Sequence, residues 1–161
     1  MGKDNKTFII LSMHRSASSL VAKGLNNAGV NMGENLLSGL ADNPEGHFED
    51  LDFLYTNIHL MNGDNWKDVN TPIKNLNMKS LIEKKDINPL WGWKDPRTIL
   101  TIERYYDLLN DPIIVALFRN PEKVGMSLEK RGDMTKKEGI KLAKEYNKKL
   151  LLFLNKRFGE D

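Results

Sequence analysis

Three apolar segments of the chain have the pattern of β-strands. Phe8 to Leu11 is a continuous, β-rich run, which is typical of a strand buried on both faces of a parallel sheet. Ile113 to Phe118 has the same character and predicts a second strongly buried strand. The shorter run from Leu90 to Trp93 predicts a third strand.

Helical signals follow each predicted strand. Apolar residues recur at helical spacing from Leu20 to Ala28, and Gly29 ends that pattern. Asp95-Pro96 has the order of a cap residue before a proline at the first helical position, so we expect a helix from there to about Leu109. Asn120-Pro121 repeats this order and predicts another helix.

Three more helices are expected elsewhere in the chain. The first runs from Leu51 to Met61, the second lies near Met78 to Lys85, and the third begins at a capping box and reaches about Arg157. The capping box consists of Thr135 and Glu138. The segment from Val30 to Gly46 reads as a loop with room for one short helix. Strands that alternate with helices predict an α/β fold with a parallel sheet.

Composition limits the classes of function. With 161 residues, 40% of them hydrophobic, the chain is expected to form a single domain over residues 1–161. A formal net charge of only +2 argues against a general polyanion binder, so nucleic acid is not an expected partner. The absence of cysteine excludes a disulfide framework, a thiolate metal site and a cysteine nucleophile. The N-terminal apolar run has four residues, Phe8 to Leu11, which favours a cytoplasmic protein without a membrane partner.

A candidate anion site follows the first predicted strand. The segment from Ser12 to Ser19 contains Arg15 and several hydroxyl groups where a helix begins. Free N–H groups and the helix dipole favour an anion there, and an arginine adds donors suited to phosphate or sulfate. The alternative is a serine-rich helix cap with a surface arginine. The nucleotide triphosphatase loop G-x-x-x-x-G-K-[ST] is absent.

A second candidate anion site follows the strand at Ile113 to Phe118. Arg119 comes directly after that strand, and Ser127 lies eight positions later on the next predicted helix. An arginine at this position attracts a phosphate rather than a metal ion. The alternative is an arginine that caps the helix, with a neutral surface serine.

These segments together resemble the sulfotransferases that use 3′-phosphoadenosine 5′-phosphosulfate (PAPS), chiefly the branch with R-S-G-[ST]-[ST] in the first loop. The resemblance rests on three ordered segments and covers roughly Thr7 to Gly132. The segments are Arg15-Ser16-Ala17-Ser18-Ser19, Lys94-Asp95-Pro96-Arg97-Thr98 and the span from Arg119 to Ser127. The resemblance implies a P-loop NTPase-like three-layer sandwich around a central parallel sheet.

The resemblance also implies the nucleotide contacts. The first loop, with Arg15, Ser16, Ala17, Ser18 and Ser19, would bind the 5′-phosphosulfate, and Arg119 and Ser127 would bind the 3′-phosphate. Ala17 stands where the family usually has glycine, so alanine costs energy there if the backbone needs a positive φ. PAPS is the implied cofactor, adenosine 3′,5′-bisphosphate (PAP) the implied product, and a hydroxyl-bearing acceptor the implied partner. No metal is expected.

The implied catalytic residues come from two further segments. Glu49, in a region resembling N-P-x-G-[YF]-x-E, is the first candidate for the general base, and His47 is the alternative. Arg15 would stabilise the leaving oxygen, Lys94 would contact the sulfuryl group or that oxygen, and Arg97 would hold an acidic acceptor. The alternative for Glu49 is a carboxylate in the first turn of a helix, and for Asp95 a pair with a neighbouring arginine. Trp91 and Trp93 could line an acceptor cleft, but they fit a core better.

Three other functions stay open on the sequence. One is a module that binds PAPS or PAP without turnover, and another is a P-loop-fold small-molecule kinase that needs magnesium and ATP. The third is an interaction protein that uses its lysine-rich last helix. The sequence also leaves open a homo-oligomer in which a second subunit completes the adenine side.

Overall fold

The computed structural model describes residues 5–37, 46–62 and 78–159. In this part of the chain three parallel strands form one sheet in the order β2-β1-β3. They are β1 (Lys6–Ser12), β2 (Leu90–Lys94) and β3 (Pro112–Leu117). The predicted α/β fold with a parallel sheet is confirmed at this level.

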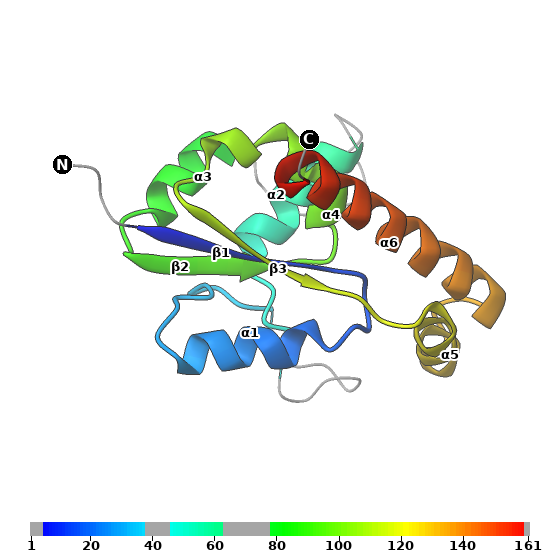
Figure 1. The fold of residues 1–161 in the computed structure, drawn as a ribbon. Helices are drawn as coiled ribbons and strands as arrows, with labels where there is room; N and C mark the ends of the chain where they lie inside the picture. The colour runs from blue at the N-terminus through cyan, green and yellow to red at the C-terminus, as the bar shows by residue number, and fades with distance from the viewer. Residues whose placement is uncertain (1–4, 38–45, 63–77, 160–161) are drawn as a thin grey trace.

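Helices lie on both faces of the sheet, as Figure 1 shows. One face is covered by α1 (Ser18–Asn27), and the other by α2 (Leu51–Asn62), α3 (Met78–Lys85) and α6 (Lys136–Phe158). The last of these begins at the predicted capping box of Thr135 and Glu138. The helix α5 (Pro121–Arg131) follows β3 and packs against α6. These five helices confirm the sequence predictions.

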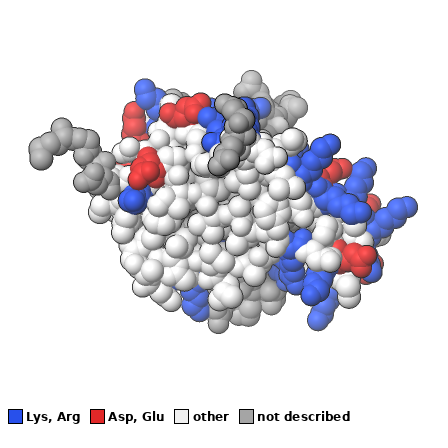
Figure 2. Space-filling model, viewed as in Figure 1, with Lys and Arg blue, Asp and Glu red and all other residues white. Residues whose placement is uncertain are grey.

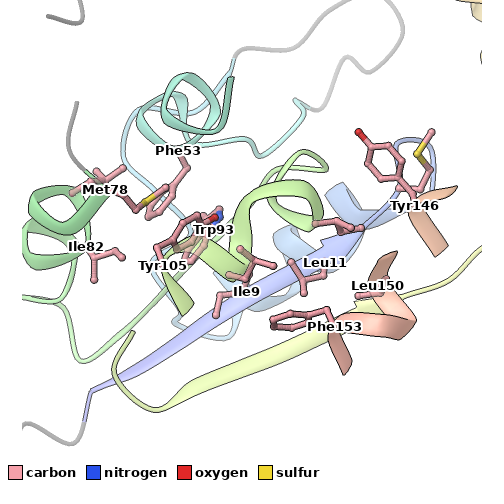
Figure 3. Packing of buried hydrophobic residues seen from close by; sticks show 14 of the residues in the cluster. Ile9, Leu11, Phe53, Met78, Ile82, Trp93, Tyr105, Tyr146, Leu150 and Phe153 are labelled. Carbon is pink, nitrogen blue, oxygen red and sulfur yellow. The ribbon is translucent and has the colours of Figure 1, made fainter. Parts of the chain in front are cut away.

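The alternation of side chains along β1 divides the core between the two faces. Ile10 belongs to a small cluster with Ala22 of α1, whereas Ile9 and Leu11 belong to the larger cluster on the opposite face. Neighbouring residues of a strand point to opposite faces, so one buried strand supports both layers of helices. Figure 3 shows Ile9 and Leu11 beside Leu150 and Phe153 of α6.

Aromatic rings form the centre of the larger cluster. The rings of Phe53 and Trp93 stack with their centroids 4.1 Å apart, and Trp91 lies against both. Figure 3 shows the Phe53 and Trp93 rings lying together between α2 and β2. Trp91 and Trp93 are both buried, which confirms that they are core residues rather than a cleft lining.

The expected helix from Asp95-Pro96 to about Leu109 is wrong. The chain forms the short helix α4 (Thr98–Thr101) and two 3₁₀ turns, η1 (Ile102–Arg104) and η2 (Tyr106–Leu108). Tyr105 leaves helical geometry with φ −141°. The β-branched residues in this segment have low helix propensity, and buried hydrogen bonds of Thr101 and Tyr105 to α2 replace a regular helix.

The expectation of a strongly buried strand at Ile113 to Phe118 is also wrong. Every residue of β3 is only half-buried, and Phe118 lies beyond the strand with 47% of its surface exposed. No strand in the described part of the chain pairs with the outer edge of β3. An apolar run therefore predicted the strand but not its place at an edge.

The segment from Val30 to Gly46 is a loop as far as the structure describes it. Residues 30–37 contain isolated bridges to β2 and to Asp50 but no helix, and residues 38–45 lie outside the described residues. Most of the stretch between Asp64 and Pro89 that precedes α3 also lies outside them.

Charged side chains are unevenly distributed over the surface. Figure 2 shows lysine and arginine gathered at the end of the molecule where α5 and α6 lie, and an uncharged area where Figure 1 draws the strands. None of the helices in the described residues is long and apolar enough to cross a membrane.

Candidate functional site

A pocket of about 320 Å³ lies at the carboxyl edge of the sheet. Its wall combines the loop between β1 and α1, residues 46–49, the end of β2 and Arg119, which lies two residues after β3. The carboxyl ends of parallel strands meet at one edge, which is where α/β folds usually bind ligands. The predicted site residues line this pocket except for Ser127 and Arg97; those that line it are Arg15, Ser16, Ala17, Ser18, Ser19, His47, Glu49, Lys94 and Arg119.

The loop between β1 and α1 presents backbone and hydroxyl groups to the pocket. Arg15 and Ala17 both have left-handed backbone conformations, with φ of 64° and 62°. Ala17 is the N-cap residue of α1 and provides no side-chain cap, so the helix N-terminus is open to a ligand. The condition under which alanine was expected to cost energy at this position, a positive φ, is therefore met.

The serines of this loop have different surroundings. The hydroxyl of Ser16 is buried and has no hydrogen-bond partner in the described part of the chain, although Ser16 lines the pocket. Ser19 Oγ donates to the carbonyl of His47 at 3.1 Å and so joins the loop to residues 46–49. A buried hydroxyl without a partner is costly, so Ser16 is the serine best placed to gain from a bound ligand.

The two predicted anion sites are joined directly. Arg15 Nε donates to Ser127 Oγ at 3.0 Å, although these residues are 112 positions apart in the chain. Arg119 donates a hydrogen bond to the carbonyl oxygen of Arg15. The helix α5 is capped by Asn120, whose side chain accepts from Glu122 N at 2.8 Å. Arg119 is therefore not the cap of α5, and the alternative for this residue is wrong.

Glu49 forms a buried ion pair at the pocket wall. Its Oε1 lies 2.9 Å from Lys94 Nζ, and its Oε2 lies 3.6 Å from Arg97 Nη1. The side chains of Glu49 and Lys94 are 8% and 3% exposed, so each charge depends on the other for compensation. Asp50 Oδ1, not Glu49, accepts from the backbone N–H of Asp52 in the first turn of α2. The alternative in which Glu49 serves the helix N-terminus is therefore wrong.

Asp95 supports Arg97 from beneath the pocket. Asp95 Oδ1 accepts from Arg97 Nη1 at 2.7 Å and from the backbone N–H of Arg97 at 3.2 Å. Burial raises the pKa of Asp95, while the charge of Arg97 acts in the opposite direction. The expected pair between Asp95 and a neighbouring arginine is confirmed. The helix begins at Thr98 rather than directly after Asp95.

His14 is a site residue that the sequence did not single out. It lines the pocket, and its ring meets the edge of Tyr146 at a centroid distance of 6.3 Å. Burial, aided by the charge of Arg97, lowers the pKa of His14 to about 4, so its imidazole is neutral at pH 7. Its position beside Arg15 at the end of a buried strand was the signal that could have found it.

Two further basic residues of the pocket were also missed. Lys23 lies four residues after Ser19 on α1, and Arg131 lies four residues after Ser127 on α5. Residues four apart on a helix share a face, so helical spacing could have placed both beside the predicted site. Arg131 also forms an ion pair with Asp133.

The comparisons with known proteins do not identify a family. No protein-family model, no curated protein and no solved structure matches the chain. Within the described residues, no group of three histidine, aspartate or glutamate side chains could hold a metal ion.

Proposed function

We propose that this protein is a PAPS-dependent sulfotransferase with a P-loop NTPase-like three-layer sandwich. The observation that carries the proposal is the contact between Arg15 and Ser127, reinforced by the hydrogen bond from Arg119 to the Arg15 carbonyl. This contact brings together two groups of residues. The loop between β1 and α1 suits a 5′-phosphosulfate, and Arg119 with Ser127 suits a 3′-phosphate. A ligand with anionic groups at two ends of one ribose matches that arrangement.

The residues present fit such a ligand. The unpartnered hydroxyl of Ser16 and the open N-terminus of α1 offer donors on one side of the pocket. Arg15 and Arg119 supply positive charge, and guanidinium groups bind phosphate oxygens in a bidentate manner. The volume of about 320 Å³ is at the lower end of the range of about 300–1,000 Å³ for small-molecule pockets.

The residues around the Glu49–Lys94 ion pair have different roles in the proposed sulfuryl transfer. PAPS supplies a sulfuryl group whose sulfur forms a bond to the acceptor oxygen as its bond to the 5′-phosphate oxygen breaks, with PAP leaving with the electron pair. Glu49 accepts the proton of the acceptor hydroxyl, and His47 is the alternative base in the same pocket. Lys94 and Arg15 stabilise the negative charge that develops on the leaving oxygen. Because a sulfuryl group carries less charge than a phosphoryl group, these cations suffice without a metal.

Calorimetric titration tests the nucleotide site. PAP should bind to the wild-type protein, magnesium-ATP should not, and Arg119→Ala should weaken PAP binding by roughly 10- to 100-fold, because hydrogen bonds to charged groups contribute about 1.5–3 kcal/mol. Lys123→Ala removes an exposed charge from the same region outside the pocket and should leave binding unchanged. Binding of magnesium-ATP alone would support the kinase, and binding of neither nucleotide would refute the proposal.

Turnover separates the enzyme from a binding module. The strained Ala17 is the observation that favours a module, because it stands where a flexible glycine would place the loop at lower cost. Transfer of labelled sulfate should be measured against tyrosyl, sugar and small-molecule hydroxyls. Glu49→Gln should slow transfer by roughly 10²–10⁴-fold while PAP still binds, and His47→Gln should not. The reverse result would make His47 the base. PAP binding without any transfer would support the alternative of a binding module without turnover.

A further inference from the structure

A buried polar network lies behind the pocket, centred on Asn57 of α2. Asn57 is fully buried, and its side-chain amide makes four hydrogen bonds. Its Nδ2 donates to Asp95 Oδ2 at 2.8 Å and to Thr98 Oγ1 at 3.0 Å. Its Oδ1 accepts from Thr101 Oγ1 at 2.7 Å and from the Tyr105 hydroxyl at 3.2 Å. The side chain of Asn57 is therefore held in one orientation.

The network continues to the charged groups of the pocket. One carboxylate oxygen of Asp95 faces Asn57, and the other accepts from Arg97. Arg97 lies 3.6 Å from one oxygen of Glu49, whose other oxygen holds Lys94 at 2.9 Å. Neither Asn57 nor Asp95 lines the pocket, whereas Glu49 and Lys94 do. Through side-chain contacts, the buried pair of Asn57 and Asp95 reaches Glu49 by way of Arg97.

Stability alone does not account for the buried polar pair of Asn57 and Asp95. A carboxylate buried as deeply as that of Asp95 carries a large desolvation penalty, and apolar residues of similar volume often stabilise a protein as well as a buried ion pair does. The rest of the contact between α2 and β2 is already apolar, through Phe53 and Trp93. What the charge of Asp95 adds is a fixed position for the guanidinium of Arg97.

We infer that Asn57 and Asp95 are positioning residues, which orient Arg97 and through it the Glu49–Lys94 pair for proton transfer and charge stabilisation. The catalytic part of this inference rests on the proposed sulfotransferase function. The positioning part concerns only the residues of this chain, so it can be measured without turnover. Held geometry matters because displacement of a reacting group by about 1 Å can cost roughly 100-fold in rate.

A swapped double variant provides the test. Asn57→Asp alone places two carboxylates against each other, and Asp95→Asn alone leaves its amide NH2 facing either the Asn57 amide or Arg97, so both single variants should be destabilised. The double variant Asn57→Asp/Asp95→Asn restores one donor and one acceptor and keeps a single buried carboxylate. The hydroxyls of Thr101 and Tyr105 can still donate to the carboxylate at position 57. The double variant loses the negative charge beside Arg97, where an amide oxygen replaces a carboxylate oxygen, and the donor from position 57 to Thr98 Oγ1, whose hydroxyl can donate to the new carboxylate instead.

Three measurements are made on the wild type, both single variants and the double variant. The melting temperature of the double variant should recover most of what each single variant loses, and PAP affinity should stay at the wild-type level. The kcat for transfer should fall by roughly 10- to 100-fold without a matching change in KM for PAPS. The NMR signals of the Arg97 guanidinium, separate and slowly exchanging in the wild type, should average in the double variant.

The outcomes distinguish the two proposals. If the double variant recovers both stability and kcat, the network is structural and the positioning role is refuted. Unchanged guanidinium signals of Arg97 in the double variant would refute it as well, even if no transfer is detected in any protein. If the wild type binds no PAP and transfers no sulfate, the proposed sulfotransferase function is refuted. Averaged Arg97 signals in the double variant would still support the positioning of Arg97 by Asp95.

Discussion

At the scale of single residues, the loop after β1 carries backbone strain where it meets the pocket. Arg15 and Ala17 both have positive φ, and neither is glycine. A left-handed conformation costs a residue with a Cβ roughly 1–2 kcal/mol. Strain of this kind persists only where the surrounding structure enforces it, and it gathers at functional sites. Here it turns the loop so that Arg15 reaches Ser127 and the N-terminus of α1 faces the pocket.

Replacement of Ala17 by glycine should relieve part of this strain. We expect Ala17→Gly to raise the free energy of unfolding by about 0.5–1 kcal/mol, because the left-handed cost exceeds the added entropy of the unfolded chain. Ala28→Gly is the matched control, because Ala28 has a φ of −84°. It should lower stability by a similar amount. Urea denaturation measures both changes, and a loss of stability in both variants would contradict the strain at Ala17.

At the scale of elements, α5 and α6 approach each other through two glycines. A Cβ on Gly125 would lie 2.6 Å from the carbonyl of Lys136 and 2.8 Å from Ile140 Cγ1. A Cβ on Gly139 would lie 2.8 Å from the Cα of Gly125. Such distances leave no room for a methyl group. The helix α5 that packs here also carries Ser127, which bonds Arg15.

Alanine at position 125 should therefore destabilise the protein although alanine favours helices. We expect Gly125→Ala to lower the free energy of unfolding by about 1–3 kcal/mol, since overpacking forces the two helices apart. Gly24→Ala on α1 is the control, because nothing lies within 4 Å of its added Cβ. It should raise stability by about 1 kcal/mol. Chemical denaturation of the two variants gives opposite signs if the contact is as close as described, and equal signs would disprove it.

At the scale of the whole molecule, the pocket gathers ionisable groups from segments far apart in the chain. His14 lies near Arg97, Glu49, Lys94 and Arg131. The carboxylates of Glu49 and Asp95 lie among the cations, so opposite charges compensate one another inside the fold. Unfolding releases all of these groups into water together, which makes global stability depend on pH.

The contribution of His14 to that dependence has a definite sign. Burial lowers the pKa of His14 from 6.5 to about 4, so the unfolded chain binds more protons between these values. Its stability contribution is complete above pH 6.5 and is lost as the pH falls towards 4, by about 3 kcal/mol in total.

Comparison with His14→Gln isolates this effect. The free energy of unfolding, measured between pH 4 and 7, should depend less steeply on pH in the variant than in the wild type. The raised pKa of Asp95 has the opposite effect, since its contribution is lost as the pH rises above 3.8. That contribution is common to both proteins and cancels in the difference. Parallel curves for the two proteins would show that His14 is not buried in its neutral form.

The ends of the strands and their neighbours were predictable from sequence. Apolar runs placed β1, β2 and β3, and the roles expected of Arg15 and Arg119 follow from their positions within three residues of the ends of β1 and β3. Glu49 and His47 were identified by their motif rather than by any periodicity. The position of His14 beside Arg15 was its one sequence signal, because its neighbours Tyr146 and Arg97 are distant in the chain.

Other features required the folded structure because their partners are distant in sequence. The pair of Glu49 with Lys94 spans 45 positions, and the bond of Asn57 to Asp95 spans 38. The cap order of Asp95-Pro96 favoured one helix after Asp95, but the hydrogen bonds of Asn57 with Thr98 and Thr101 favour α4 and two 3₁₀ turns instead.

The sequence by itself determined the order of the elements, the parallel sheet and the residue types that meet at its carboxyl edge, because these follow from local hydrophobic patterns and from the geometry of parallel strands. Only the tertiary structure decided that β3 is half-buried at an edge, that Arg15 bonds Ser127 and that Asn57 holds Asp95. Burial and long-range hydrogen bonds depend on what packs across the fold, and local patterns carry no information about such partners.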